Sequence, residues 1–306
     1  MELRHLRYFV AVADEMHFTR AAAKLGIAQP PLTQQIQALQ HELGVKLFER
    51  SGRGVALTDA GRAFLGEARS ILAQVAAAVG KAKDAARGLV GRLQVGFTES
   101  ASFHPLVTET LRTFQTVYPE VELRLREEPS TSLVSALGAG DLDLAFVRPP
   151  YPTHPSVQFE LLAEEEMVAA VPADHPLAKR ERLRLEDLST ERFILYPRAV
   201  RPGLSDEILE ACRRRGFEPH VAQEAPQLSS TINLVATGMG VSIVPEGMRQ
   251  VRPQAVCYLP IADLPVKASL GLAGMLHSSS PMVANFYRVT RGCLPTAPGR
   301  KRSAAG

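Results

Sequence analysis

The chain has 306 residues, 45% of them hydrophobic, which is enough for two or three domains with separate cores. Three widely separated cysteines argue against a disulfide framework or a metal knuckle. No apolar run reaches the roughly 18 residues of a membrane helix. From these two observations we expect a cytoplasmic protein without membrane contact, and we expect no metal or cofactor. The net charge of +3 combines a basic first part (12 Lys/Arg against 8 Asp/Glu over residues 1–88) with an acidic body (19 against 24 over residues 89–290), as in a protein that touches a polyanion at one end.

Three short helices are predicted in the first part of the chain. Apolar residues at helical spacing predict an amphipathic helix that ends before Asp14. Thr19 is a good N-cap for a second helix over residues 20–25, which Gly26 ends. A third helix begins near Pro30 and Pro31, where missing N–H groups cost nothing. These spacings are typical of a helix-turn-helix.

The third helix has one apolar and one polar face. Its buried stripe is Leu32, Ile36, Leu39 and Leu43. Glutamine and threonine can reach base edges in the major groove of double-stranded DNA, so this helix is predicted to read DNA. The alternative is a three-helix packing module with a solvated glutamine face. The candidate DNA-binding residues here are Thr19, Gln29, Pro30, Pro31, Thr33, Gln34 and Gln37.

A β-hairpin is predicted directly after the third helix. Val45, Leu47 and Phe48 indicate one strand and residues 55–57 the other, with a basic turn over residues 50–54 between them. Arg50 and Arg53 are placed to meet phosphates or enter a minor groove. A solvated arginine is the alternative for each, but the position after the reading helix favours DNA contact.

Residues 59–87 predict one long helix with an apolar stripe. Thr58 and Asp59 cap it, and about 29 residues would extend over roughly 45 Å. The helix cannot bury its stripe alone, so we expect it to pair with a second copy of the chain; folding back onto the next domain is the alternative. The stripe comprises Leu65, Ile71, Leu72, Val75, Val79, Ala82 and Ala86.

The first 60 residues resemble the winged helix-turn-helix of LysR-type transcriptional regulators. The resemblance rests on MELRHLRYFVAVAD, FTRAAAKLGIAQPPLTQQIQALQHELGVKLFER and GVALTDAG, a close and ordered match. It implies a DNA-binding domain over residues 1–58, a linker helix over 59–88 and an effector-sensing domain over 89–294. It also implies assembly as a dimer of dimers and DNA bending, with RNA polymerase as a further candidate partner. Residues 295–306 are expected to form a disordered basic tail.

Strands alternate with helices from residue 89 onward, which predicts an α/β fold with mainly parallel sheets. The rhythm occurs twice, so we expect two lobes: lobe I over residues 89–163 and 268–294, and lobe II over 164–267. This arrangement is similar to periplasmic solute-binding proteins. The fold class is therefore α/β with an all-α N-terminal part.

Polar residues at strand ends and helix starts predict an effector site between the lobes. Free N–H groups at a helix start favour a carboxylate, and Arg148, Arg198 and Arg201 are expected as basic groups at the edge of the cleft. The alternative for each Ser or Thr is an ordinary cap, and for each Arg an ordinary surface residue. The segments ILYPRAVRPGLSDEILEACRRRGFEPHV and INLVATGMGVSIVP resemble the subgroup that governs aromatic or chloroaromatic catabolism, which implies an aromatic or dienoic carboxylate as effector. Glu99 departs from the pattern, because an acid beside a carboxylate site repels the ligand. Either its side chain points away from the site, or it selects an effector that bears a hydrogen-bond donor. The candidate residues are Thr98, Glu99, Ser100, Ser102, Ser130, Thr131, Arg148, Arg198, Arg201, Pro202 and Gln227.

No catalytic motif competes with this interpretation. The chain has no HExxH, CxxC, GxSxG or phosphate-binding GxxxxGK[ST], and the acids Asp141 and Asp143 are interpreted as structural. Glu164, Glu165 and Glu166 are interpreted as a solvated charge run. We therefore predict a small-molecule-switched DNA-binding transcriptional regulator that is not an enzyme. The alternative is a cytoplasmic small-molecule-binding protein whose N-terminal unit serves only for association.

Overall fold

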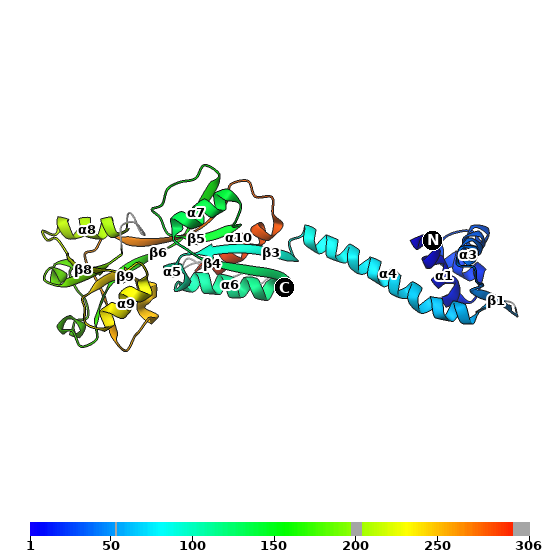
Figure 1. The fold of residues 1–306 in the computed structure, drawn as a ribbon, viewed down its shortest axis with the longest axis horizontal. Coiled ribbons are helices and arrows are strands. Elements are labelled where there is room, and N and C mark those ends of the chain that lie inside the picture. The colour runs from blue at the N-terminus through cyan, green and yellow to red at the C-terminus, as the bar shows by residue number, and fades with distance from the viewer. Residues whose placement is uncertain (53, 197–203, 296–306) are drawn as a thin grey trace. The chain divides into compact units, whose positions relative to one another are not determined.

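The computed structural model describes residues 1–52, 54–196 and 204–295, and the chain divides into two compact units, Met1–Ala86 and Arg87–Gly306 (Figure 1). The first unit is helical apart from one hairpin and the second is α/β. This confirms the predicted fold class, α/β with an all-α N-terminal part. The prediction of mainly parallel sheets was wrong, because most strand pairs in the large sheet of the second unit are antiparallel. Arg53, Arg198, Arg201, Pro202 and the predicted tail beyond residue 295 lie outside the described residues.

The first unit is a three-helix core followed by a hairpin and a long helix. Phe9, fully buried on the first helix, stacks against Phe48 of the hairpin and Phe64 of the long helix, with ring centroids 5.3 and 5.1 Å apart. These contacts join all parts of the unit in one core. The elements are α1 (Leu3–Glu15), α2 (Phe18–Leu25), α3 (Gln29–Leu43), β1 (Phe48–Ser51), β2 (Gly54–Leu57) and α4 (Asp59–Ala86).

Three local predictions in this unit were wrong. α1 continues through Asp14 and ends at Glu15, with Met16 at the C-cap in a left-handed conformation with φ 48°. α2 begins at Phe18 with His17 at the N-cap, so Thr19 lies within the first turn and its hydroxyl bonds to the side chain of Gln29. The first hairpin strand begins at Phe48, and Val45 is 46% exposed before it.

The second unit contains two lobes, which share the long strand β6 (Val157–Pro172) (Figure 1). The first part of β6 pairs antiparallel with β11 (Lys267–Met275), and its last six residues pair with β9 (Ser242–Pro245) and β10 (Val256–Pro260). In lobe I the order β11-β5-β3-β4 places β3 between two parallel neighbours. The elements of lobe I are β3 (Gly91–Phe97), α5 (Glu99–Ser102), α6 (Pro105–Val117), β4 (Val121–Glu127), α7 (Ser130–Ala139), β5 (Leu144–Val147), the first part of β6 (Val157–Pro172), β11 (Lys267–Met275) and α10 (Pro281–Cys293).

Lobe II has its own hydrophobic core, formed around the end of β6 and the neighbouring helices. Its strand β7 pairs in parallel with β8, a strand that the sequence did not predict. The elements are η1 (Pro176–Lys179), η2 (Leu185–Leu188), β7 (Arg192–Leu195), α8 (Leu204–Arg214), β8 (His220–Glu224), α9 (Leu228–Ala236), β9 (Ser242–Pro245), η3 (Glu246–Gln250) and β10 (Val256–Pro260).

Candidate functional site

The polar face of α3 is exposed in the described structure. Leu32, Ile36 and Leu39 are at most 1% exposed, and Leu43 of the predicted stripe is half-buried against the same core. The stripe therefore faces the core and determines which side chains of α3 face outward. The exposed members of the candidate set on α3 are Gln29, Pro30, Pro31, Gln34 and Gln37, and Thr33 is half-buried. Such a face can enter a major groove and present amide donors and acceptors to base edges.

A hydrogen bond between helices orients the first of these side chains. The hydroxyl of Thr19 on α2 donates to Oε1 of Gln29 at 2.8 Å. A side chain held in one position loses less conformational entropy when it binds. Thr19 therefore orients the side chain of Gln29, a contact that its position in the sequence did not indicate. Thr33 bonds to the Gln29 carbonyl of its own helix at 3.1 Å.

Gln40 positions the hairpin relative to α3, a role that no motif or spacing in the sequence indicated. Its Oε1 accepts hydrogen bonds from the N–H groups of Leu47 and Phe48, at 2.7 and 3.2 Å. Gln40 thereby satisfies two backbone donors at the start of the hairpin. In the hairpin, Arg50 lies exposed on β1 rather than in the turn, and no ion pair of Arg50 occurs among the described residues. Its charge remains available to a phosphate.

The long helix α4 leaves much of its apolar stripe uncovered. The Thr58 hydroxyl accepts from the N–H of Gly61 at 3.0 Å, which confirms the predicted cap. Leu65, Ile71 and Leu72 pack against the core of the first unit. Val79 is 50% exposed, and Ala82 and Ala86 are exposed as well. This half of the stripe is the face that pairing with a second chain would bury.

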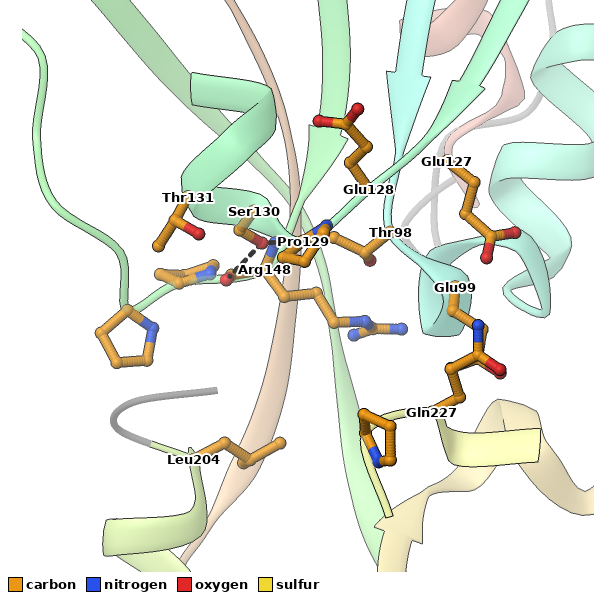
Figure 2. Close-up of a pocket in the computed structure, with 13 residues that line it drawn as sticks. Thr98, Glu99, Glu127, Glu128, Pro129, Ser130, Thr131, Arg148, Leu204 and Gln227 are labelled. Atoms are coloured by element: carbon orange, nitrogen blue, oxygen red, sulfur yellow. Dashed lines mark hydrogen bonds between the residues drawn. The ribbon is translucent and has the colours of Figure 1, made fainter. Parts of the chain in front are cut away.

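A cavity of about 340 Å³ lies between the two lobes of the second unit (Figure 2). Lobe I contributes the ends of β3, β4 and β5 and the start of α7, and lobe II contributes the starts of α8 and α9. The placement agrees with the rule that ligands bind at the carboxyl ends of parallel strands. The lining residues are Thr98, Glu99, Glu127, Glu128, Pro129, Ser130, Thr131, Arg148, Pro149, Pro150, Leu204, Pro226 and Gln227.

Thr98 supplies an unsatisfied hydroxyl to the cavity wall. The residue is 4% exposed, and its Oγ1 has no hydrogen-bond partner among the described residues. A buried hydroxyl without a hydrogen-bond partner destabilises the folded protein, and a hydrogen bond to a ligand oxygen offsets this cost. Thr98 is thus the candidate residue best suited to bind a polar atom of a ligand.

Arg148 lines the cavity but is not the edge cation that the sequence predicted. It is 7% exposed and forms an ion pair with Glu165, and its Nη1 and Nη2 donate to carbonyl oxygens of Ala268 and Ser100, each at 3.3 Å. The interpretation of residues 164–166 as a solvated run was therefore wrong for Glu165. Alternation along β6 turns its side chain inward while Glu164 and Glu166 stay exposed.

Glu99 directs its carboxylate to the N-terminus of α9. Oε2 accepts from the N–H of Leu228 at 2.6 Å, and Oε1 accepts from the N–H of Ser229 at 2.9 Å. The N-cap residue Gln227 makes no capping bond with its own side chain, so Glu99 of lobe I caps a helix of lobe II. Figure 2 shows Glu99 beside Gln227 at the cavity wall.

The serine candidates divide between the cavity wall and the interior. Ser130 Oγ donates to the carbonyl of Arg148 and accepts from its N–H, both at 3.1 Å, and Thr131 lies beside it in the wall (Figure 2). Ser100 and Ser102 do not line the cavity, because α5 starts at Glu99 and turns them away from it. Ser100 is 2% exposed and Ser102 donates to the Glu99 carbonyl at 2.6 Å.

The described residues contain no group of three or more His, Cys, Asp or Glu side chains that could hold a metal ion. Within the same residues, no helix has both the length and the apolar character of a membrane span. Asp143 accepts from the Gln94 N–H at 2.7 Å, which confirms its structural interpretation.

An exposed polar helix next to a basic hairpin, followed by a two-lobed α/β unit with a cavity, defines a ligand-responsive DNA-binding regulator. Residues 3–62 match the bacterial regulatory helix-turn-helix protein model of the lysR family, and residues 86–292 match the LysR substrate binding domain. The chain therefore belongs to the LysR family of transcriptional regulators, and it is a regulator rather than an enzyme. The alternative of a binding protein without a DNA role is not supported.

Relatives and solved structures match over almost the whole chain. The HTH-type transcriptional regulator BudR of Raoultella terrigena is 42% identical over 289 residues, covering 94% of this chain and 100% of BudR. The crystal structure of CbnR, a LysR family transcriptional regulator, superposes with a TM-score of 0.86 at 33% identity, covering 95% of this chain and 100% of that chain. Full-length CbnR in complex with its target DNA gives a TM-score of 0.83 at 32% identity, covering 96% and 100%.

Proposed function

We propose that the effector of this regulator is a small carboxylate with an aromatic or dienoic body, bound at the N-terminus of α7 in the cavity between the lobes. The observation that carries the proposal is the buried hydroxyl of Thr98 beside this helix start, which has no hydrogen-bond partner in the part of the chain that the structure describes. Pro129, Ser130 and Thr131 bring the first turn of α7 to the cavity, where unpaired N–H groups and the helix dipole stabilise an anion.

The rest of the wall suits an apolar body. Pro149, Pro150, Leu204 and Pro226 line the cavity opposite or beside the helix start. A planar hydrocarbon body gains free energy by leaving water for such a wall. Arg148 is already neutralised by Glu165, so the helix start, with the Thr98 hydroxyl, is the described feature left to bind the carboxylate.

A matched pair of ligands tests the proposal. Isothermal titration should show saturable binding of benzoate and much weaker binding of benzamide, which has the same body without the charge. Thr98→Val should weaken benzoate binding by about tenfold or more, since a hydrogen bond to a charged group contributes roughly 1.5–3 kcal/mol. The protein's own stability should hardly change, because this hydroxyl bonds to no described residue. Equal affinity for benzamide and benzoate would overturn the proposed effector class.

On the DNA side, the proposed reading residues are the exposed side chains of α3, with Gln29 held by Thr19 and with Arg50 on a phosphate. Effector binding between the lobes favours a conformation with a different angle between them. This population shift moves the α3 helices of the assembly relative to the DNA. The chain acts in the cytoplasm, where its DNA lies, as a dimer of dimers joined through α4, and needs no cofactor. Footprinting of the promoter beside its own gene, with and without effector, tests the contacts on the DNA and their shift. A repeat of the footprint after treatment with a chelator tests whether a metal is needed.

A further inference from the structure

Two helix starts that can hold an anion reach the cavity, and they differ in what occupies them. Residues 129–131 at the start of α7 line the wall, and no side-chain cap of α7 occurs among the described residues. Pro226 and Gln227 at the start of α9 line it too, but the first N–H groups of α9 are bonded to Glu99. α8 also starts at the wall, at Leu204, and carries the acids Asp206 and Glu207 in its own first turn.

The geometry at α9 is that of a bound carboxylate. Both oxygens of Glu99 accept from consecutive backbone N–H groups, at 2.6 and 2.9 Å, which is how a helix start holds a free carboxylate. The carboxylate reaches α9 from 129 residues upstream in the sequence, from the other lobe. The contact therefore shows that the start of α9 accepts an anion that does not come from its own loop.

The surroundings offer little to a second ligand carboxylate. Glu127 is an exposed acid of the wall for which no ion pair occurs among the described residues. Glu128 is paired with Arg126 and turns its carboxylate away from Arg148 (Figure 2). Buried Arg148 is paired with Glu165. A ligand with one carboxylate can bind at the start of α7, whereas the second carboxylate of a diacid meets the start of α9, which Glu99 already occupies.

We infer that Glu99 is a built-in occupant of a second carboxylate site at the start of α9 and thereby restricts the effector to compounds with one carboxylate. The inference rests on the proposed binding of a carboxylate effector at α7. Glu99 acts here as a specificity-determining residue. An acid at this position is unusual for a carboxylate-binding site, and it rejects diacids because its own carboxylate occupies the start of α9.

A matched pair of dienoic acids tests the inference. Sorbate and trans,trans-muconate share a six-carbon diene and differ in that muconate carries a second carboxylate in place of a methyl group. Isothermal titration of the wild-type protein should give muconate an affinity at least about tenfold lower than that of sorbate, the effect of one unpaired like charge. Glu99→Ala empties the start of α9 and should bring the two affinities to within about threefold.

Glu127→Ala is the matched control, because it removes a wall acid and leaves Glu99 on α9. It should change the affinity ratio by no more than about twofold, since a solvated charge is well screened. Glu99→Gln keeps an acceptor oxygen for α9 without the charge and serves if Glu99→Ala does not fold. An unchanged ratio in the Glu99 variant, or wild-type protein that binds muconate as well as sorbate, overturns the inference while the proposed effector class stands.

A second measurement separates the inference from the effector class. Sodium acetate should raise the melting temperature of Glu99→Ala relative to an equal concentration of sodium chloride, because free carboxylate refills the start of α9. It should not do so in the wild-type protein, where Glu99 already occupies this helix start. If the wild-type protein binds neither dienoic acid and acetate still stabilises Glu99→Ala selectively over wild type, the proposed effector class fails and the carboxylate site at α9 stands. The absence of selective stabilisation by acetate overturns the site itself.

Discussion

Arg148 and Glu165 form an ion pair in the interior of the second unit, with side chains 6% and 9% exposed. Arg148 follows β5 of lobe I, whereas Glu165 lies on the shared strand β6 and also accepts from the N–H of Gly247 in lobe II at 3.0 Å. The pair therefore links the two lobes through one carboxylate. A buried charge that loses its partner is strongly destabilising.

Glu165→Gln should lower the stability of the second unit. The amide oxygen can still accept from Gly247, but the charge of Arg148 is left buried without a counter-charge, which costs about 3–5 kcal/mol. Thermal unfolding followed by circular dichroism measures the loss as a fall in melting temperature. Glu164→Gln, on the exposed neighbour, is the control and should stay within about 0.5 kcal/mol of wild type. Equal effects of the two substitutions would show that the ion pair does not stabilise the interior.

On α3, Gln34→Ala should weaken operator binding while leaving non-specific binding almost unchanged. Gln34 is exposed on the polar face, and each good base contact contributes about 1–3 kcal/mol of discrimination. Gel shifts with operator and scrambled DNA, at one stated salt concentration, give the specificity ratio. Gln74→Ala removes an exposed glutamine from α4 and is expected to leave this ratio alone.

Arg50→Ala should instead weaken binding to both DNAs alike. An arginine that contacts a phosphate contributes charge and no base readout, so the dependence of log K on log salt should become less steep by about one unit. A loss confined to the operator would place Arg50 at a base edge and not at the backbone.

Local periodicity made much of the fold predictable. The stripe of Leu32, Ile36 and Leu39 identified the outer face of α3, and strand–helix alternation identified the two-lobed unit. Short strands with weak alternation, β8 and β10, were missed because tertiary pairing stabilises them.

The partners of the site residues were less predictable, since they lie far apart in the sequence. Thr19 was expected to cap its own helix and bonds to Gln29 instead, and Arg148 was expected at an exposed edge and pairs with Glu165. Glu99 reaches backbone groups 129 residues away. Spacing along a chain indicates which face a residue occupies, but the fold decides which group from another element meets it there.

Val79→Glu should dissociate the assembly that α4 supports. Val79 is 50% exposed in the described chain, and a buried seam would have to desolvate the new charge. Analytical ultracentrifugation should show smaller species and a weaker self-association by several orders of magnitude. Ala77→Glu, on the opposite face of the same helix, adds the same charge and should leave the assembly intact. Assembly that survives Val79→Glu would place the contact elsewhere.

His104 should make the second unit less stable in mild acid. It precedes α6, and its Nδ1 accepts a hydrogen bond from the N–H of Leu106 at 3.1 Å, which needs an unprotonated nitrogen. Burial holds the pKa of His104 below its ordinary value of 6.5; Glu165 opposes this shift and Arg148 adds to it. Below about pH 6.5 the unfolded chain therefore binds a proton that the folded chain resists, so stability falls as the pH drops through this range.

The substitution His104→Asn isolates this contribution. Asparagine is a good N-cap whose oxygen can accept from Leu106, but it does not titrate. Wild type and variant should have similar melting temperatures at pH 8, where the histidine is neutral in both states. Between pH 7 and 5 the wild-type melting temperature should fall more steeply, because only the wild type takes up this proton on unfolding. Parallel curves over that range would mean that the folded protein accommodates the imidazolium beside Glu165, and that the carboxylate outweighs burial at this position.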